Sequence, residues 1–236
     1  MGADLSGGWL ACHIRSGPEA SPRQLRKRYF MRIILAAAFA LAAGTAFAQT
    51  IPTTAEQPGQ AEPARIEAGT YQVDPAHTQV SWAVNHLGVT MLDGLFGASE
   101  GSLTIDPDKL SAAKVDVTFP IDDVRVTFAD FAGHLQSESF FNAAEYPTAH
   151  FVSTSVTPAD GNTATIVGDL TIKDQTKPVT IYAKFVGAGT NPMDDKLNVG
   201  FYGTATIKRS DFGLDAYVPA VSDEVHLEIN AAFMAP

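Results

Sequence analysis

The sequence of 236 residues contains almost no cysteine and relatively few basic groups. Its single cysteine, Cys12, excludes a disulfide framework and any cysteine-rich zinc or iron–sulfur site. The 16 Lys and Arg residues face 26 Asp and Glu residues, which gives a formal net charge of −10. Because such a chain repels phosphate backbones and anionic headgroups, nucleic-acid binding is not expected. Apolar residues make up 45% of the chain, enough for one sizeable core.

The chain also lacks an apolar run of the ~20 residues that a membrane-spanning helix needs. The shorter run 33–43 follows a basic residue and precedes the small-x-small cleavage pattern Ala46-Phe47-Ala48. This pattern predicts a secretory signal peptide over 31–48, with a membrane anchor as the alternative. We expect residues 1–30 to be an upstream extension before a true start at Met31, although their basic residues would also suit an extended n-region.

Removal of residues 1–48 takes away six basic and two acidic residues, so 10 basic and 24 acidic residues remain, a net charge of −14. The remaining chain has no cysteine and must be held together by packing, in a compartment that we expect to be the periplasm. Residues 49–68 carry three prolines and no apolar period, which predicts a flexible linker. Residues 69–236 are then one domain.

Alternation of apolar and polar residues dominates this domain. In 224–233, for example, Val225, Leu227 and Ile229 alternate with Glu224, His226 and Glu228, the pattern of a half-buried strand. Strands are expected at 70–73, 79–85, 102–106, 114–121, 149–156, 163–172, 179–186, 198–208 and 224–233. Short turns between them imply antiparallel pairing, and eight or nine such strands with one apolar face favour closure into a barrel.

One interval departs from this period. Phe128, Phe131 and Leu135 stand at helical spacing within 127–135. Asn142 with Glu145 then resembles a capping box on a single turn. The sequence therefore predicts a short helical excursion, placed as a plug or lid over one mouth of the barrel.

Two short motifs carry no function in this context. Gly97–Gly101 matches G-x-S-x-G but precedes a strand instead of a helix, and Asp211-Phe212-Gly213 lacks the other kinase motifs. His77 and His86 are nine residues apart, so in a continuous strand they point to opposite faces. A shared metal would need a bend between them, and no metal-ligand spacing supports one. His226 lies on a polar strand face and is expected to be solvated.

The apolar side chains outnumber those that strand alternation requires, and many fall in 87–96 and 128–141. One interpretation is core packing with a loop tucked against it. The other is an apolar cavity, because an eight-stranded barrel either fills with side chains or holds one small ligand. The pattern alone leaves both open.

An ordered set of motifs covers nearly all of 69–236. Its blocks are Tyr71–Trp82, Asn85–Gly88, Gly94–Phe96, Gly133–Leu135, Ser139–Phe141, Tyr146–Phe151, Gly168–Ile172, Thr176–Val179 and Thr206–Gly213. None of these blocks is specific alone, but the ordered set resembles the YceI-like family of exported polyisoprenoid- and lipid-binding proteins.

The resemblance implies an all-β fold: an extended antiparallel eight-stranded lipocalin-like barrel with a short helical insertion near one mouth. Its tunnel would bind one amphiphile, with no cofactor and no metal. The residues expected to contact the apolar tail are Trp82, Leu87, Met91, Leu95, Phe96, Phe119, Phe128, Phe131, Leu135, Phe140, Phe141, Phe151 and Phe212. Those expected near the headgroup are His77, His134, Arg209 and Asp211. Family members often carry a basic and an acidic residue just before the helix, where this chain reads Phe128-Ala-Asp130-Phe131. If that basic residue holds a charged headgroup, this chain prefers a less charged ligand.

The leading hypothesis is an exported carrier or scavenger of an isoprenoid-type lipid. An enzyme acting on an isoprenoid or quinone-like lipid is an alternative, although no acid/base pair or metal set is visible by spacing. A periplasmic partner of a membrane cytochrome is another, because some family domains are joined to such modules. The sequence leaves open a homodimer, the identity of the ligand and its chain length.

Overall fold

The computed structural model describes residues 56–236, so the predicted signal peptide and upstream extension lie outside the described residues. This part contains ten strand segments: β1 Gly69–Val73, β2 Gln79–His86, β3 Thr90–Gly97, β4 Glu100–Ile105, β5 Lys114–Pro120, β6 Thr148–Ala159, β7 Thr163–Ile172, β8 Gln175–Thr190, β9 Leu197–Lys208 and β10 Glu224–Met234. The helical segments are α2 Ala129–Gln136 and the 3-10 turns η1 Pro63–Arg65, η2 Leu110–Ala112, η3 Ile121–Asp123 and η4 Arg209–Phe212.

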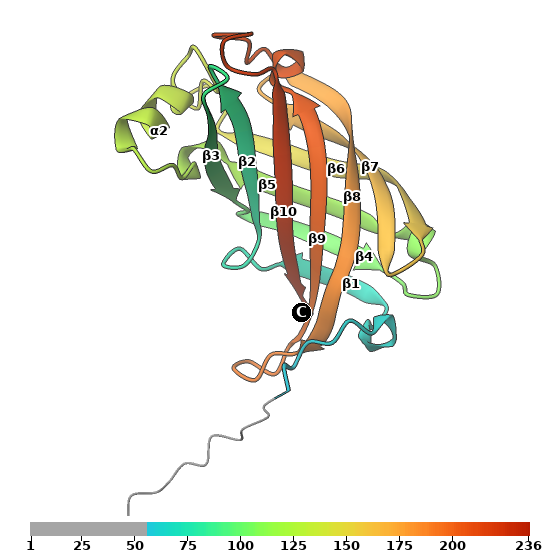
Figure 1. Ribbon diagram of the computed structural model, residues 1–236. Coiled ribbons are helices and arrows are strands. Elements are labelled where there is room, and N and C mark those ends of the chain that lie inside the picture. Colours follow the sequence, from blue (N-terminus) through green and yellow to red (C-terminus); the bar gives the residue numbers. More distant parts are fainter. Residues whose placement is uncertain (1–55) are drawn as a thin grey trace, which may run out of the picture. The chain divides into compact units, whose positions relative to one another are not determined.

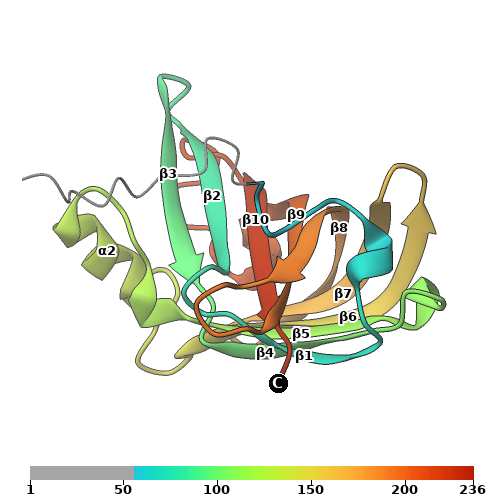
Figure 2. The same cartoon turned by 90° about the horizontal axis from the view of Figure 1, so that it is seen from below.

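Eight of these strands close into an antiparallel barrel. They run in the order β1-β4-β5-β6-β7-β8-β9-β10, and β10 pairs back onto β1 through Gln72 with Met234 and Val73 with Phe233. Seen from below in Figure 2, the strands surround a common axis. The predicted eight-stranded barrel is therefore confirmed.

The β2–β3 hairpin extends the barrel wall at one end (Figure 1). β2 pairs with the first half of β10, so one edge of β10 is shared between β1 and β2. The sequence analysis predicts no strand over 87–96, whereas Thr90–Gly97 is strand β3. Asp93 and Gly94 interrupt its apolar alternation, and only the pairing with β2 reveals it as a strand.

The predicted alternation is confirmed along the other walls. Val225, Leu227, Ile229, Ala231 and Phe233 of β10 all face the barrel interior. Buried residues gather in two clusters, one where β1, the end of β8 and the start of β9 meet, the other beside η4 and the start of β8. The apolar core therefore lies at both ends of the barrel and leaves its middle free.

The short helical excursion is also confirmed, as α2 and the single turn after Asn142. Figure 1 shows α2 beside β3, at the end of the barrel where the β2–β3 hairpin has its tip. Within residues 56–236, no helix is long and apolar enough to cross a membrane.

Residues 56–66, here called the N-terminal strap, differ from the flexible linker that the sequence predicts. Gln60 and Ala188 of β8 exchange two backbone hydrogen bonds, at 3.1 and 3.0 Å. The Asn162 side chain donates to the Ala61 carbonyl at 3.0 Å, and Ile66 is only 6% exposed. Figure 2 shows the described chain beside the end of β8 before it enters β1. The sequence analysis missed this attachment, because the proline-rich polar composition of the segment does not reveal that Gln60 pairs with Ala188, 128 positions later in the chain.

Gly189 provides the space that the strap needs, which makes it a test of the attachment. A Cβ at Gly189 would overlap the Pro58 carbonyl oxygen. We expect Gly189→Ala to raise the exchange rates of the Gln60 and Ala188 amides by about tenfold or more, as measured by hydrogen exchange. Gly69→Ala is the matched control, because a Cβ there meets nothing within 4 Å. Unchanged exchange in Gly189→Ala would show that the strap does not depend on this contact.

Candidate functional site

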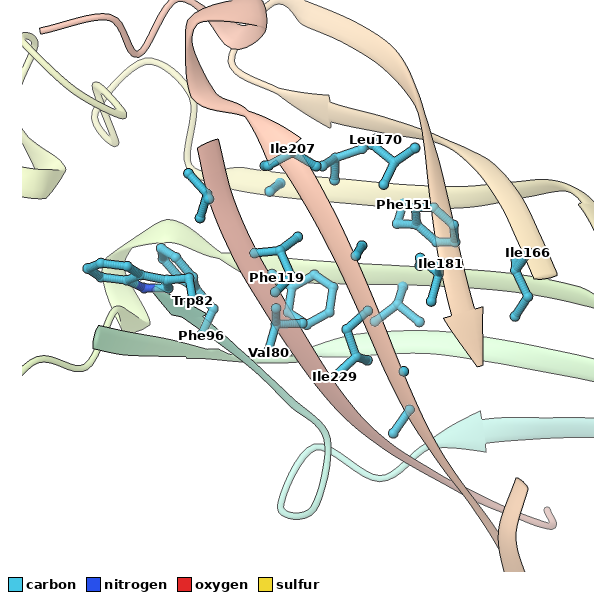
Figure 3. A pocket seen from close by; sticks show the side chains of 18 of the residues that line it. Val80, Trp82, Phe96, Phe119, Phe151, Ile166, Leu170, Ile181, Ile207 and Ile229 are labelled. Atoms are coloured by element: carbon cyan, nitrogen blue, oxygen red, sulfur yellow. The ribbon is translucent and has the colours of Figure 1, made fainter. Parts of the chain in front are cut away.

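A cavity of about 800 Å³ occupies the barrel between the two core clusters. Figure 3 shows the side chains of β2, β3 and β5 to β10 that point into it, among them Trp82, Phe119 and Ile229. Its lining is almost entirely aliphatic and aromatic. Its volume falls within the ~300–1,000 Å³ range of pockets for small molecules. The cavity interpretation, which the sequence left open beside solid packing, is the one that the structure supports.

Small residues on three neighbouring strands keep this space free. Ala164 of β7 lies opposite Ala183 of β8, which lies opposite Gly203 of β9. The same row continues through Ile229 and Val80 to Phe96 of β3. All six residues face the cavity. The row is therefore short on β7, β8 and β9 and becomes bulkier on the strands that follow, so at this level side chains do not fill the barrel.

A glycine also positions the indole of Trp82. Gly94 of β3 lies directly opposite Trp82 of β2, and a Cβ there would overlap the indole ring and meet a Val126 methyl carbon at 2.8 Å. The ring thus lies against the bare backbone of β3 and forms part of the cavity wall. Its Nε1 is buried without a hydrogen-bond partner among the described residues.

The thirteen predicted tail-contact residues divide into two groups. Nine line the cavity: Trp82, Leu87, Phe96, Phe119, Phe131, Leu135, Phe140, Phe141 and Phe151. Four do not: Met91, Leu95, Phe128 and Phe212. Whether the lining residues touch a ligand stays a prediction.

Strand parity and helix position explain the four exceptions. Met91 and Leu95 fall on the face of β3 opposite to Phe96, which only recognition of that strand could reveal. Phe128 is the N-cap residue of α2 and is exposed. Phe212 is 1% exposed within the core cluster beside η4, so it supports the barrel end instead of lining the cavity.

Aromatic rings surround His134 at the α2 end of the cavity. Its ring centroid lies 4.8 Å from that of Phe140, 6.3 Å from Tyr217 and 6.5 Å from Phe131. All four residues line the cavity, and His134 and Tyr217 are exposed to solvent as well. The rings therefore stand at the mouth, where cavity and solvent meet, which is the position predicted for His134.

Arg209 also lines the cavity, but its donors are used by the backbone. Its guanidinium donates through Nε to Ser222 at 2.8 Å, through Nη2 to Val221 at 2.9 Å, and through Nη1 to Ala216 at 2.8 Å and to Leu214, in each case to the carbonyl oxygen. These carbonyls belong to residues 213–223, here called the mouth loop. Burial lowers the pKa of Arg209 from its ordinary value, an effect that the charges of Asp223 and Asp215 oppose. The predicted headgroup residue thus holds the mouth loop in place.

The other two predicted headgroup residues lie away from the cavity. His77 stands in the turn between β1 and β2, where its Nδ1 lies 2.6 Å from the Asp74 carboxylate. Asp211 is exposed on η4. The sequence analysis placed both residues near the mouth from the order of the motifs. That order gives no information on the direction in which a side chain leaves a turn, so the prediction failed for these two residues.

Aliphatic residues of the lining were missed as ligand contacts. They include Val80, Ile166, Leu170, Ile181, Ala183, Gly203, Ile207 and Ile229. Ile229 lies on the strand face that the alternation had already assigned to the interior, and the same alternation applied to the other predicted strands could have found the rest. The tail-contact prediction favoured large aromatic side chains instead, although small residues create the space.

Two polar side chains of the lining, Thr78 and Arg209, are occupied by backbone partners. Between residues 56 and 236, no three His, Cys, Asp or Glu side chains gather as a metal site would require. Thr78, which lines the cavity, exchanges hydrogen bonds with the backbone of Ala232 at 2.9 and 3.0 Å. With Thr78 and most of Arg209 satisfied by the backbone, the interior is suited to an apolar chain.

The mouth loop should depend on Arg209 for its stability. We expect Arg209→Met to lower the free energy of unfolding by roughly 2–4 kcal/mol, because four carbonyl oxygens lose a charged donor. Arg209→Lys should recover little, since one ammonium cannot span the four acceptors. Denaturant midpoints and slopes measure the loss. A change below ~0.5 kcal/mol in Arg209→Met would contradict the structural role.

Asp223 gives a pH-dependent test of the same loop. Its carboxylate accepts from the Ser210 N–H at 2.9 Å and the Ser210 hydroxyl at 2.8 Å. The backbone bond first, then the hydroxyl and the Arg209 charge, hold the pKa of Asp223 below its ordinary value. A lowered folded-state pKa stabilises the protein above the unfolded-state pKa of about 4 and loses this effect as the pH falls through the folded-state pKa.

We therefore expect Asp223→Asn to be less stable than the parent by about 1 kcal/mol at neutral pH. The difference between the two should narrow as the pH drops below about 4. Melting temperatures across a pH series measure it. A stability difference between the parent and Asp223→Asn that grows as the pH falls would contradict the lowered pKa of Asp223.

Comparisons with known proteins agree with this geometry. The YceI-like domain model matches residues 71–233. A UPF0312 protein of Pseudomonas aeruginosa is 40% identical over 162 residues, covering 68% of this chain and 84% of that protein. The crystal structure of BcnA from Burkholderia cenocepacia superimposes on this structure with a TM-score of 0.59 and 26% sequence identity. The match covers 68% of this chain and 98% of BcnA.

A structure described as a polyisoprenoid binding domain from Saccharophagus degradans aligns with a TM-score of 0.52, over 70% of this chain and 98% of that one. At 13% identity, this likeness shows the fold alone. The sequence matches therefore point to the same kind of protein as the structure, an eight-stranded barrel with an apolar cavity. This chain belongs to the YceI-like family.

Proposed function

We propose that this protein is an exported carrier or scavenger that binds one amphiphilic lipid of the polyisoprenoid type and performs no chemistry on it. The observation that supports this most directly is the apolar cavity of about 800 Å³ along the barrel. The signal-peptide pattern in 31–48 supports export, and a periplasmic location agrees with a remaining chain that has no cysteine.

Burial of an apolar tail is the main source of binding free energy that such a cavity offers. Each buried methylene contributes ~0.8 kcal/mol, so fifteen to twenty equivalents of an isoprenoid tail would contribute more than about 10 kcal/mol. Association costs about 4–15 kcal/mol, a range whose upper end cancels this gain. At the lower end of that range, burial of the tail alone supplies the affinity, without a charged anchor.

The polar groups at the mouth favour a ligand head with little charge. His86, His134 and Tyr217 line the cavity there. Arg209 is the only Lys or Arg side chain among the lining residues, and four of its five N–H groups already donate to the mouth loop. This supports a hydroxyl or carbonyl head over a phosphate. It also agrees with the absence of a basic residue from 126 to 130.

Native mass spectrometry of the protein, purified without detergent from the cells that produce it, tests the proposal. We expect an adduct whose mass identifies one lipid with a long apolar tail. A bare polypeptide after gentle purification, together with no uptake of added prenols or quinones, would refute the carrier function.

Ala183→Trp tests the position of the ligand. The indole would extend from the small-residue wall into the cavity, so we expect at least a tenfold loss of lipid affinity. The melting temperature should stay close to that of the parent, because the space for the ring already exists. Lys184→Trp is the matched control, since the neighbouring side chain on β8 is exposed and does not line the cavity. Equal affinity of both variants would place the ligand elsewhere.

A further inference from the structure

Exposed apolar side chains are concentrated around the mouth of the cavity. Ten large hydrophobic residues of the described chain are exposed. Six of them belong to three segments at the α2 end: Leu87, Val89 and Met91 at the tip of the β2–β3 hairpin, Phe128 at the start of α2, and Tyr217 and Val218 in the mouth loop. We call these six residues the apolar rim. Apolar patches of this kind mark interaction sites on soluble proteins.

Contacts between the three segments make the rim continuous. The Leu87 N–H donates to the Ala220 carbonyl at 2.8 Å, which joins the hairpin tip to the mouth loop. The Tyr217 ring lies 6.3 Å from that of His134, which joins the same loop to α2. Figure 1 shows the hairpin tip, α2 and the mouth loop at the same end of the barrel.

The rim surrounds the opening of the cavity. Leu87 and Tyr217 are exposed and also line the cavity, and Phe131, one turn along α2 from Phe128, lines it too. An apolar path therefore continues from the rim into the barrel through Leu87, Phe131 and the Tyr217 ring. We propose that the rim docks on the uncharged surface of a lipid bilayer, so that the lipid passes between membrane and cavity without crossing water. This inference depends on the proposed lipid-carrier function.

Charge around the rim determines which bilayer it suits. Asp93, Asp130 and Asp215 are exposed beside the rim residues on β3, α2 and the mouth loop. Arg125, the basic side chain near α2, is paired with Asp123. An anionic surface would repel this side of the protein, whereas zwitterionic headgroups would not. The occupant is therefore a zwitterionic bilayer, with apolar side chains inserted at the headgroup level.

Flotation of the full protein with phosphatidylcholine vesicles tests docking. Val89 is 83% exposed, does not line the cavity and lies between β2 and β3, so Val89→Glu should leave the fold intact. We expect it to weaken vesicle binding about tenfold, because one inserted apolar side chain is replaced by a charge. Phe128→Asp is a second variant, since a carboxylate is favourable at a helix N-cap. It should weaken binding similarly.

Met193→Glu is the matched control. Met193 is 91% exposed, like Val89, but lies in the loop between β8 and β9 at the opposite end of the barrel (Figure 1). This variant should bind vesicles as the parent does. Inclusion of phosphatidylglycerol should weaken binding of the parent at low salt, and added salt should restore it. No binding by the parent, or equal effects of Val89→Glu and Met193→Glu, would overturn docking at the rim.

The carrier function and the docking surface are separable in this design. Ala183→Trp should lose lipid in native mass spectra but still float with vesicles, because its substitution lies inside the barrel. Val89→Glu should retain lipid and lose flotation. A parent that carries lipid but never floats refutes the rim alone. A parent that floats through the rim but never takes up lipid refutes the carrier function alone.

Discussion

Closure of an antiparallel sheet into a ring is the constraint on which the rest of this structure depends. Once β10 pairs with β1, the two-residue period sends alternate side chains of each strand inward. What fills the interior is then decided by the size of those side chains. The inward side chains of Ala164, Ala183 and Gly203 are small, whereas that of Phe96 in the same row is large. The cavity is the volume that this unequal row leaves between the two end clusters.

Different segments cover the two ends of the barrel. At the β1 end, the N-terminal strap pairs with Ala188 and places Ile66 in the core. At the other end, Arg209 holds the mouth loop by four carbonyl oxygens while aromatic rings surround His134. A buried cation with its donors satisfied organises the backbone and leaves the interior apolar. The opening and the apolar rim are both built on this end.

A hydrocarbon chain of this size leaves a membrane slowly through water, because each exposed methylene costs ~0.8 kcal/mol. A carrier for such a chain needs an interior that is dry and an entrance that can approach the bilayer. Under the proposed carrier function, the cavity would meet the first need and the apolar rim the second. The acidic residues beside the rim, such as Asp93 and Asp130, would then restrict which lipid surface is compatible.

Most of the fold was accessible from the sequence, because alternation is a local property. The inward face of β10 was assigned correctly, and so was the helical spacing of Phe131 and Leu135. Strand β3 was not, because Asp93 and Gly94 break its pattern, and only the approach of Trp82 explains the glycine. This one omission also misplaced Met91 and Leu95, whose parity follows from the strand.

The sequence by itself determined the all-β class, the ring of strands, the helical interruption and the family, since each depends on residue period or motif order. Only the tertiary structure decided that the interior is hollow, that the strap is attached to β8, and that Arg209 serves the mouth loop. The physical reason is that alternation specifies the direction of each side chain but not what it meets. Ala183 and Gly203 are adjacent across strands, yet 20 positions apart in the chain. The free volume between such residues exists only when the sheet has closed.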